Sequence, residues 1–241
     1  MTITNPASGT NVQEIAAGIF RINTPINIVG GFSFNQYLIL DDQPLLFHTG
    51  PRKLFPVVRE AVEHLIPAQR LGFVALSHFE ADECGSLNEW LAVAPQAVPV
   101  CSRIAAMVSI DDVADRPARP LADGEPLELG QHTVKWLDAP HLPHGWETGY
   151  LMESKTGTMF CGDLFTQGGS GSVALTDSDI LEPSEAFRAP LDYFSHSTNT
   201  SALMEKLAAE NPSTLACMHG SAWTGKGGDL LRALGDRLTR H

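Results

Sequence analysis

The sequence contains little cysteine, and the cysteines that it has lie far apart. Four occur in 241 residues, and no two are spaced as a CxxC pair: Cys84, Cys101, Cys161 and Cys217. A disulfide framework or a zinc knuckle requires cysteines at closer and more regular intervals, so neither is expected. We expect free, buried thiols in a reducing compartment.

Basic residues are also scarce. Sixteen lysines and arginines stand against 28 acidic residues, which gives a formal net charge of −12. Nucleic acids and anionic membrane surfaces select basic patches, so neither is expected as a partner. The sequence further lacks a leader-like start and an apolar run long enough to span a membrane, and a cytoplasmic protein is predicted.

No composition break, Ser/Pro-rich linker or internal repeat divides the chain, so one domain is expected over residues 1–241. Apolar runs and apolar faces predict strands at Ile15–Asn23, Asn35–Leu40, Pro44–Phe47, Leu71–Leu76, Leu127–Leu129, Thr133–Leu137, Gly149–Met152, Thr158–Cys161 and Thr214–Cys217, and helices at Lys53–Leu65, Ser86–Leu91, Thr200–Glu210 and Gly228–Arg240. Residues 164–196 are expected to form an irregular loop. Two strand-rich halves, each followed by helices, predict an α/β fold with two packed sheets and helices outside.

The most informative stretch is residues 77–83, Ser-His-Phe-Glu-Ala-Asp-Glu, directly after the apolar strand at 71–76. In an extended chain alternate side chains point the same way, so His78, Glu80 and Asp82 would converge. Open sheets usually hold their functional groups at the carboxyl ends of strands. An imidazole and two carboxylates in this position predict part of a metal centre.

Three later segments repeat the pattern of an apolar strand followed by a metal-compatible side chain. These side chains are His141, Asp163 and His219. A single histidine or aspartate after a strand is more often a packing or turn residue than a ligand. Four such segments in order are far more specific, and together they supply three imidazoles and three carboxylates. That set is sufficient for two metal ions.

The four segments, in this order, resemble the metallo-β-lactamase superfamily, whose fold is a four-layer αββα sandwich. Most members carry an H-x-H-x-D-H motif and bind zinc, whereas Glu80 here occupies the second position. That variant resembles the diiron domain of flavodiiron proteins. Residues 219–223, HGSAW, and residues 35–39, NQYLI, are similar to the same branch. The resemblance extends from Ile19 to Trp223.

The resemblance implies two irons. One would be held by His78, Glu80 and His141, the other by Asp82 and His219, and Asp163 would bridge them; no catalytic residue is expected beyond the metal centre. A carboxylate in place of an imidazole favours iron or manganese over zinc, although zinc also accepts carboxylates.

Three residues near these ligands have open roles. His144 competes with His141, which is preferred because His141-Leu142-Pro143 resembles the H-x-P pattern of the family; His144 is expected beside the metals or at the pocket mouth. Glu83 stands where the family motif has a histidine, so the second metal has one imidazole fewer, uses Glu83, or binds more weakly. Cys84 is expected near the centre as a packed thiol.

Two functions follow from this resemblance. The first is a non-haem diiron protein that binds O2 and reduces O2 or NO with electrons from a rubredoxin or flavoprotein, or that senses oxygen. No flavodoxin domain with FMN is expected within 241 residues, and a homodimer is implied. The alternative is a binuclear metal-dependent hydrolase of the lactonase or thioesterase type. A binding protein with a degenerate centre is a third reading, and Glu83 is its only support.

Overall fold

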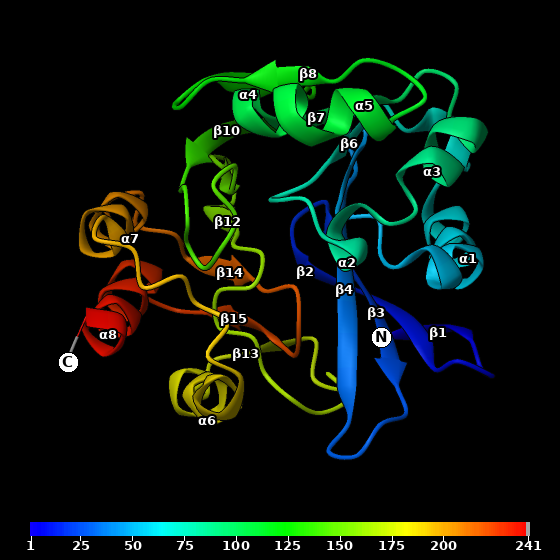
Figure 1. Ribbon diagram of the computed structural model, residues 1–241. Helices are drawn as coiled ribbons and strands as arrows, with labels where there is room; N and C mark the ends of the chain where they lie inside the picture. Colours follow the sequence, from blue (N-terminus) through cyan, green and yellow to red (C-terminus); the bar gives the residue numbers. More distant parts are fainter. Residues whose placement is uncertain (240–241) are drawn as a thin grey trace.

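The computed structural model describes residues 1–239, which form two β-sheets with helices on their outer faces (Figure 1). The first sheet contains β1 (Thr2–Asn5), β2 (Thr10–Ala16), β3 (Ile19–Ile26), β4 (Phe32–Ile39), β5 (Leu45–Phe47), β6 (Phe73–Ala75), β7 (Val98–Ser102) and β8 (Arg119–Leu121), in that order across the sheet. Strands β1 to β5 pair antiparallel, and β5 to β8 pair parallel.

The second sheet is formed by the later part of the chain. Its order is β13 (Leu175–Thr176), β15 (Ala222–Thr224), β14 (Thr214–Ala216), β12 (Thr158–Phe160), β11 (Gly149–Glu153), β10 (Thr133–Asp138) and β9 (Pro126–Glu128). Strands β12 and β14 are parallel neighbours, with Phe160 opposite Ala216. Their carboxyl ends therefore lie at the same edge of the sheet.

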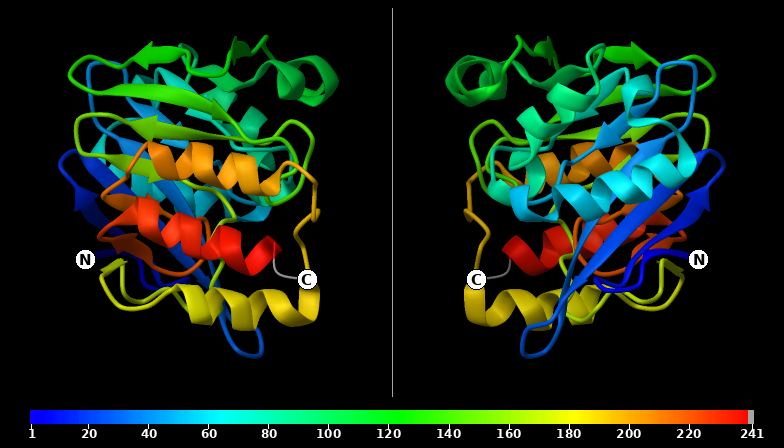
Figure 2. Two further views of the ribbon diagram at one scale, coloured as in Figure 1. Left: turned by 90° about the vertical axis from the view of Figure 1, so that its left-hand side faces the viewer. Right: turned by 90° about the vertical axis from the view of Figure 1, so that its right-hand side faces the viewer.

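The helices lie on the two outer faces (Figure 2). Helices α1 (Phe55–Leu65) and α3 (Leu87–Val93) cover the first sheet, and α7 (Thr200–Ala209) and α8 (Gly227–Thr239) cover the second. The shorter helices are η1 (Arg52–Leu54), η2 (Ala68–Arg70), α2 (Ala81–Cys84), α4 (Arg103–Ala105), the π-helical η3 (Ala106–Ile110) and α5 (Asp111–Val113), and the longer α6 is Leu181–Leu191.

Three apolar layers hold these elements together. The layer between the sheets contains large buried side chains from both, among them Phe47, Trp136 and Phe160. A second layer packs the first sheet against α1 and α3, with Val58 and Trp90 in it. A third packs the second sheet against α7 and α8. The predicted αββα sandwich is therefore confirmed.

The structure departs from the expected elements in several places. The strand expected at Ile15–Asn23 is two strands, because Gly18 reverses the chain with a φ of 74°. Residues 164–196 are not wholly irregular, since they contain β13 and α6. Strands β1, β7, β8 and β15 were not expected, and neither were helices α4, η3 and α5. The expected end of the last helix, Arg240, lies outside the described residues.

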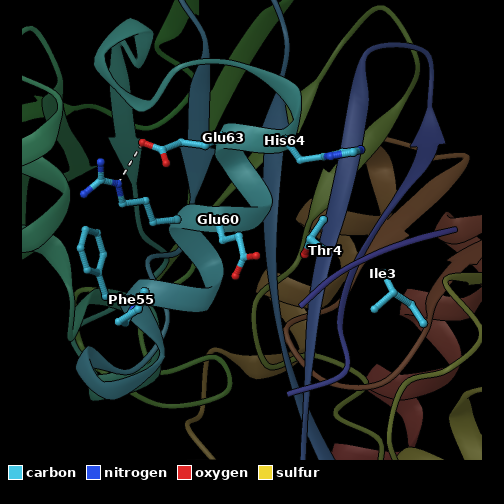
Figure 3. A pocket seen from close by; sticks show the side chains of 8 residues that line it. Ile3, Thr4, Phe55, Glu60, Glu63 and His64 are labelled. Atoms are coloured by element: carbon cyan, nitrogen blue, oxygen red, sulfur yellow. Dashed lines mark hydrogen bonds and ion pairs between the residues drawn. The ribbon is translucent and has the colours of Figure 1, made fainter. Parts of the chain in front are cut away.

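No helix in residues 1–239 is long and apolar enough to cross a membrane. A groove of about 660 Å³ lies between β1 and α1, lined by Ile3, Thr4, Phe55, Pro56, Arg59, Glu60, Glu63 and His64 (Figure 3). Its acids are already paired, Glu63 with Arg59 at 2.9 Å and Glu60 with the amide of Asn5 at 2.7 Å. We assign no function to this groove.

Candidate metal centre

Four side chains from three distant segments meet at one edge of the sandwich. They are His78, Glu80, His144 and Asp163, and each places one ligand atom within 4.8 Å of the others. Asp163 Oδ2 lies 3.5 Å from His78 Nε2 and 3.8 Å from His144 Nε2. Glu80 Oε1 lies 3.0 Å from His144 Nε2. Two imidazoles and two carboxylates therefore face a common point.

A second group adjoins the first through Asp163. His219 Nε2 lies 3.3 Å from Asp163 Oδ1 and 3.4 Å from Asp82 Oδ2. Asp163 thus presents Oδ2 to one group and Oδ1 to the other. A carboxylate that faces two ligand groups in this way is suited to lie between two metal ions.

The chain after β6 explains how Glu80 and Asp82 reach different groups. The backbone is still extended at Glu80, with φ −135° and ψ 166°, so His78 and Glu80 point the same way as expected. The chain then turns into α2, which carries Asp82 towards His219. The expectation that all three side chains lie along one extended segment is therefore wrong at Asp82.

The structure reverses the expected positions of two histidines. His141 is exposed and outside both groups, whereas His144 points its Nε2 into the first. The cause is a turn: the backbone N–H of His141 donates to the carbonyl of Gly145 at 2.7 Å, and His141 has a φ of 67°. The geometry favours His144 over His141 as the ligand.

Each of the three clustered histidines is oriented by a bond to its other ring nitrogen. His78 Nδ1 lies 2.9 Å from Ser77 Oγ. His144 Nδ1 lies 3.0 Å from the Tyr193 carbonyl, and His219 Nδ1 lies 2.9 Å from the Ser33 carbonyl. A carbonyl only accepts, so His144 and His219 donate from Nδ1. This arrangement leaves Nε2 for the centre and is typical of metal-binding histidines.

Ser77 is in turn held by a histidine that was not expected here. His48 Nε2 lies 2.9 Å from Ser77 Oγ, and its ring is fully buried. Burial, followed by the neighbouring His78, lowers the pKa of His48 to about 3, so its imidazole is neutral. His48 follows the strand at 44–47, and the same strand-end pattern could have identified it.

The ionised carboxylates and the imidazoles of the centre are groups that bind metal cations. Hydrogen bonds from His144 and His78 lower the pKa of Glu80 to about 2. Burial alone would lower the pKa of His219, but the carboxylates of Asp163 and Asp82 outweigh it and raise this pKa to about 10. His78 Nε2 and His144 Nε2 lie only 3.1 Å apart, a contact that requires a proton or a metal between them. The donor set therefore fits divalent ions.

Glu83 follows Asp82 on α2 and is completely buried. Its pKa is raised well above the usual value by burial and by the charges of Asp163 and Asp82. Neither of its carboxylate oxygens has a hydrogen-bond partner among residues 1–239. Orphaned buried oxygens at this point are a further sign that an ion belongs here.

Cys84 lies beside the centre and not in it. Its Sγ donates to the carbonyl of Glu80 at 3.0 Å. Burial and the charge of Asp82 raise the pKa of Cys84 to about 12, so it remains a thiol and a poor ligand. All four cysteines are free.

A cavity of about 230 Å³ opens onto the centre. Its walls are Phe32, Glu80, Asp82, His144, Asp163, Thr166, Phe187, Leu191, Tyr193 and His219. Phe32 stacks on the ring of His219 with their centroids 4.4 Å apart, and on Phe187 at 5.5 Å. The apolar wall comes largely from β4 and α6. The α6 side chains went unrecognised, because residues 164–196 show no pattern that points to a helix.

The family of the chain follows from these features together with sequence comparison. A family model described as ODP family beta lactamase matches residues 32–220. The chain belongs to this family. The matched range of the ODP family model includes every residue of the two ligand groups. It ends at Gly220, directly after His219.

Three relatives of this ODP family chain are named as a flavoprotein, an oxidoreductase and a flavorubredoxin. Diflavin flavoprotein A 1 of Synechocystis is 26% identical over 60% of the chain and 26% of its own length. Rubredoxin-oxygen oxidoreductase of Megalodesulfovibrio gigas is 24% identical over 70% of the chain and 42% of its own length. The anaerobic nitric oxide reductase flavorubredoxin of Pectobacterium atrosepticum is 25% identical over 83% of the chain and 41% of its own length. The chain thus spans less than half the length of these relatives.

The fold agrees with the same family. The Flv1 flavodiiron core of Synechocystis superposes with a TM-score of 0.82, at 21% identity, over 95% of the ODP family chain and 61% of that core. The structure of rubredoxin oxygen:oxidoreductase from Desulfovibrio gigas gives a TM-score of 0.79 at 17% identity. The predicted flavodiiron-like branch of the metallo-β-lactamase superfamily is confirmed.

Proposed function

We propose that this chain holds two iron ions and binds O2 or NO, which it reduces with electrons from a separate redox protein. The observation that carries the proposal is the position of Asp163 between two ligand groups, with one oxygen towards each. The names of the relatives, an oxygen oxidoreductase and a nitric oxide reductase, support the choice of substrate.

Six residues would hold the ions. His78, Glu80 and His144 would bind the first, Asp82 and His219 the second, and Asp163 would be shared. His144 replaces His141 in this set. Carboxylate-rich sites favour iron or manganese over zinc. Two ferrous ions would each supply one electron to a diatomic molecule.

The surrounding residues prepare the centre for a small substrate. A cavity of about 230 Å³ admits a diatomic molecule, and Phe32, Phe187 and Leu191 make part of its wall apolar. Burial keeps the pKa of Tyr193 above its usual value, so its hydroxyl stays protonated and donates to the carbonyl of Asp163 at 3.3 Å. The bonds to Nδ1 fix the imidazoles before any ion binds.

The electron donor and the assembly are inferred from the relatives alone. A rubredoxin or a flavoprotein is the expected donor, because the relatives are named for both. An oxygen sensor would use the same centre without turnover. A homodimer is part of the proposal and is tested by the mass of the protein in solution.

The hydrolase alternative is less well supported. A lactonase or thioesterase would place a carbonyl substrate against the same ions. The relatives reported above carry oxidoreductase or flavoprotein names, and none is named as a hydrolase.

Metal analysis and gas consumption test the proposal. Protein produced with iron supplementation is expected to contain two irons per chain. After anaerobic reduction, exposure to O2 should produce a visible absorption band, and a reduced rubredoxin or flavoprotein should drive O2 or NO consumption. Two zincs per chain, together with turnover of esters or lactones, would refute the proposal in favour of the hydrolase.

A further inference from the structure

Glu83 is a buried acid whose polar neighbours, Asp82 and His78, are themselves part of the metal centre. Its side chain is 0% exposed, and neither oxygen has a hydrogen-bond partner among residues 1–239. Glu153 provides a contrast within the same molecule, since it is equally buried but accepts the backbone N–H groups of Lys155 and Thr156 at 2.7 and 2.8 Å. A buried carboxylate without partners is costly unless something outside the chain satisfies it.

The neighbours of Glu83 are themselves acidic. One oxygen from each of Glu80, Asp82 and Glu83 lies within 4.8 Å of the others. Glu83 Oε2 also lies 3.9 Å from His78 Nε2. Three carboxylates at this separation repel one another unless one of them is protonated or a cation lies among them, and a bound cation would take the place of such a proton. The orphaned oxygens of Glu83 therefore point to the same ions as the ligand groups.

Glu83 changes the total charge of the centre. The centre contains four carboxylates, those of Glu80, Asp82, Glu83 and Asp163, and three neutral imidazoles when ions are bound. Four negative charges balance two divalent cations. A histidine at position 83 would leave one positive charge in a buried site, so Glu83 makes this centre more anionic than the usual family motif.

We propose that Glu83 binds the second metal ion together with Asp82, Asp163 and His219. This inference rests on the proposed binuclear centre. The second position then has three carboxylates and one imidazole, whereas the first has the imidazoles of His78 and His144. Carboxylate oxygen suits manganese and iron better than zinc, so the second position discriminates against zinc more strongly than the first.

Competitive metal loading tests the inference. Metal-free protein is incubated anaerobically with equal amounts of Mn²⁺, Fe²⁺ and Zn²⁺, and the ions are counted by mass spectrometry. Anomalous diffraction at each absorption edge then assigns an element to each position. Zinc binds most nitrogen and oxygen sites more tightly than manganese or iron, so the two positions are compared with each other. In the unaltered protein we expect a larger fraction of manganese and iron at the second position than at the first.

Three variants separate the roles. Glu83→His should retain two ions and raise the zinc fraction at the second position, and Glu83→Gln should reduce the content from two ions to one. Glu153→Gln removes a carboxylate that is equally buried but lies away from the centre. It should change neither the number of bound ions nor the preference between metals. Because glutamine has the size of Glu83 and also offers polar atoms to Asp82 and His78, Glu83→Gln is expected to fold, which circular dichroism of the metal-free variant checks.

The possible results distinguish the inference from the function on which it rests. Unchanged metal number and unchanged zinc preference in both Glu83 variants would overturn the role of Glu83 and leave the binuclear centre intact. Fewer than two ions in the unaltered protein would instead overturn the proposed function. If the histidine variant fails to fold, the ion count of Glu83→Gln alone decides.

Discussion

Glu147 Oε1 accepts the backbone N–H of Phe79 at 3.1 Å and so joins two ligand-bearing segments. Phe79 lies between His78 and Glu80, while Glu147 lies three residues after His144 on the loop before β11. Glu147 itself belongs to neither ligand group among residues 1–239. Its hydrogen bond connects the backbone segment that carries His78 and Glu80 to the loop that carries His144.

Glu147→Ala should therefore weaken metal binding without removing a ligand. Partners behind the ligands typically contribute about ten- to a hundredfold in metal affinity, and we expect a loss in that range. Glu147→Gln retains an acceptor oxygen and should restore most of the affinity. Titration of metal-free protein with Fe²⁺ measures the change, and equal affinity in the alanine variant would show that Glu147 does not position the ligands.

His144→Ala and His141→Ala form a matched pair. His144 points Nε2 into the first ligand group, whereas His141 is exposed and outside it. The first variant should lose one metal ion per chain, and the second should retain both. Metal counts by mass spectrometry decide, and the opposite result would restore His141 as the ligand.

Asn35→Ala should loosen the segment that carries His219. The Asn35 side chain donates to the carbonyls of Cys217 and Gly220, both at 2.9 Å, and all of these groups are buried. The two carbonyls each keep one other donor, Tyr37 Oη for Cys217 and Arg21 Nη2 for Gly220. The variant therefore loses two buried hydrogen bonds, which at about 0.5 to 1.5 kcal/mol each should lower the free energy of unfolding by about 1 to 3 kcal/mol.

Urea unfolding of the metal-free protein measures this loss of stability. Asn88→Ala is the control, because Asn88 makes both of its bonds at the surface: it donates to the carbonyl of Val113 and accepts the backbone N–H of Asp115. Its effect should be smaller. Equal effects would show that Asn35 does not hold the segment.

Glu153 should make the free energy of unfolding depend on pH. Burial raises its pKa, but bonds from Thr156, Lys155 and His132 outweigh this effect, so the folded-state pKa lies below the usual value. The ionised Glu153 carboxylate therefore contributes its full stabilisation above the pKa that Glu153 has in the unfolded chain. This stabilisation is lost as the pH falls through the lower pKa of Glu153 in the folded protein. At neutral pH, Glu153→Gln should cost about 1 to 3 kcal/mol of unfolding free energy.

Urea unfolding at neutral pH and at acid pH provides the measurement. The difference between the variant and the unaltered protein should shrink at acid pH, since the carboxyl is then protonated in both the folded and the unfolded chain. A difference that stays constant over the whole range would mean that the charge of Glu153 contributes nothing to stability.

The sequence predicted much of the sandwich, because its strands are short apolar runs and its ligands follow them in order. His78, Asp163 and His219 could be identified since each comes directly after such a strand. His144 could not, because its position depends on a loop turn between His141 and Gly145 that no periodicity reveals.

Two further features depended on the tertiary structure. Asp82 reaches His219 only because the chain leaves the extended conformation after Glu80. Helix α6 carries Pro190 and has only one buried residue, Ser184, so its sequence lacks the apolar face that identifies a helix. Its contribution to the cavity wall becomes visible only when the fold brings Phe187 next to Phe32.

The ligands come from both sheets, and this has a consequence for unfolding. His78, Glu80 and Asp82 follow β6 of the first sheet, whereas Asp163 and His219 follow strands of the second. The two halves also meet at this edge through a bond from the Gly149 N–H to the Ser77 carbonyl at 2.9 Å. Bound ions would thus act as a cross-link between sheets that are far apart in the sequence. At a thousandfold excess over the dissociation constant, such an ion adds about 4 kcal/mol to the stability, so a chelator should weaken the hold between the halves of the sandwich.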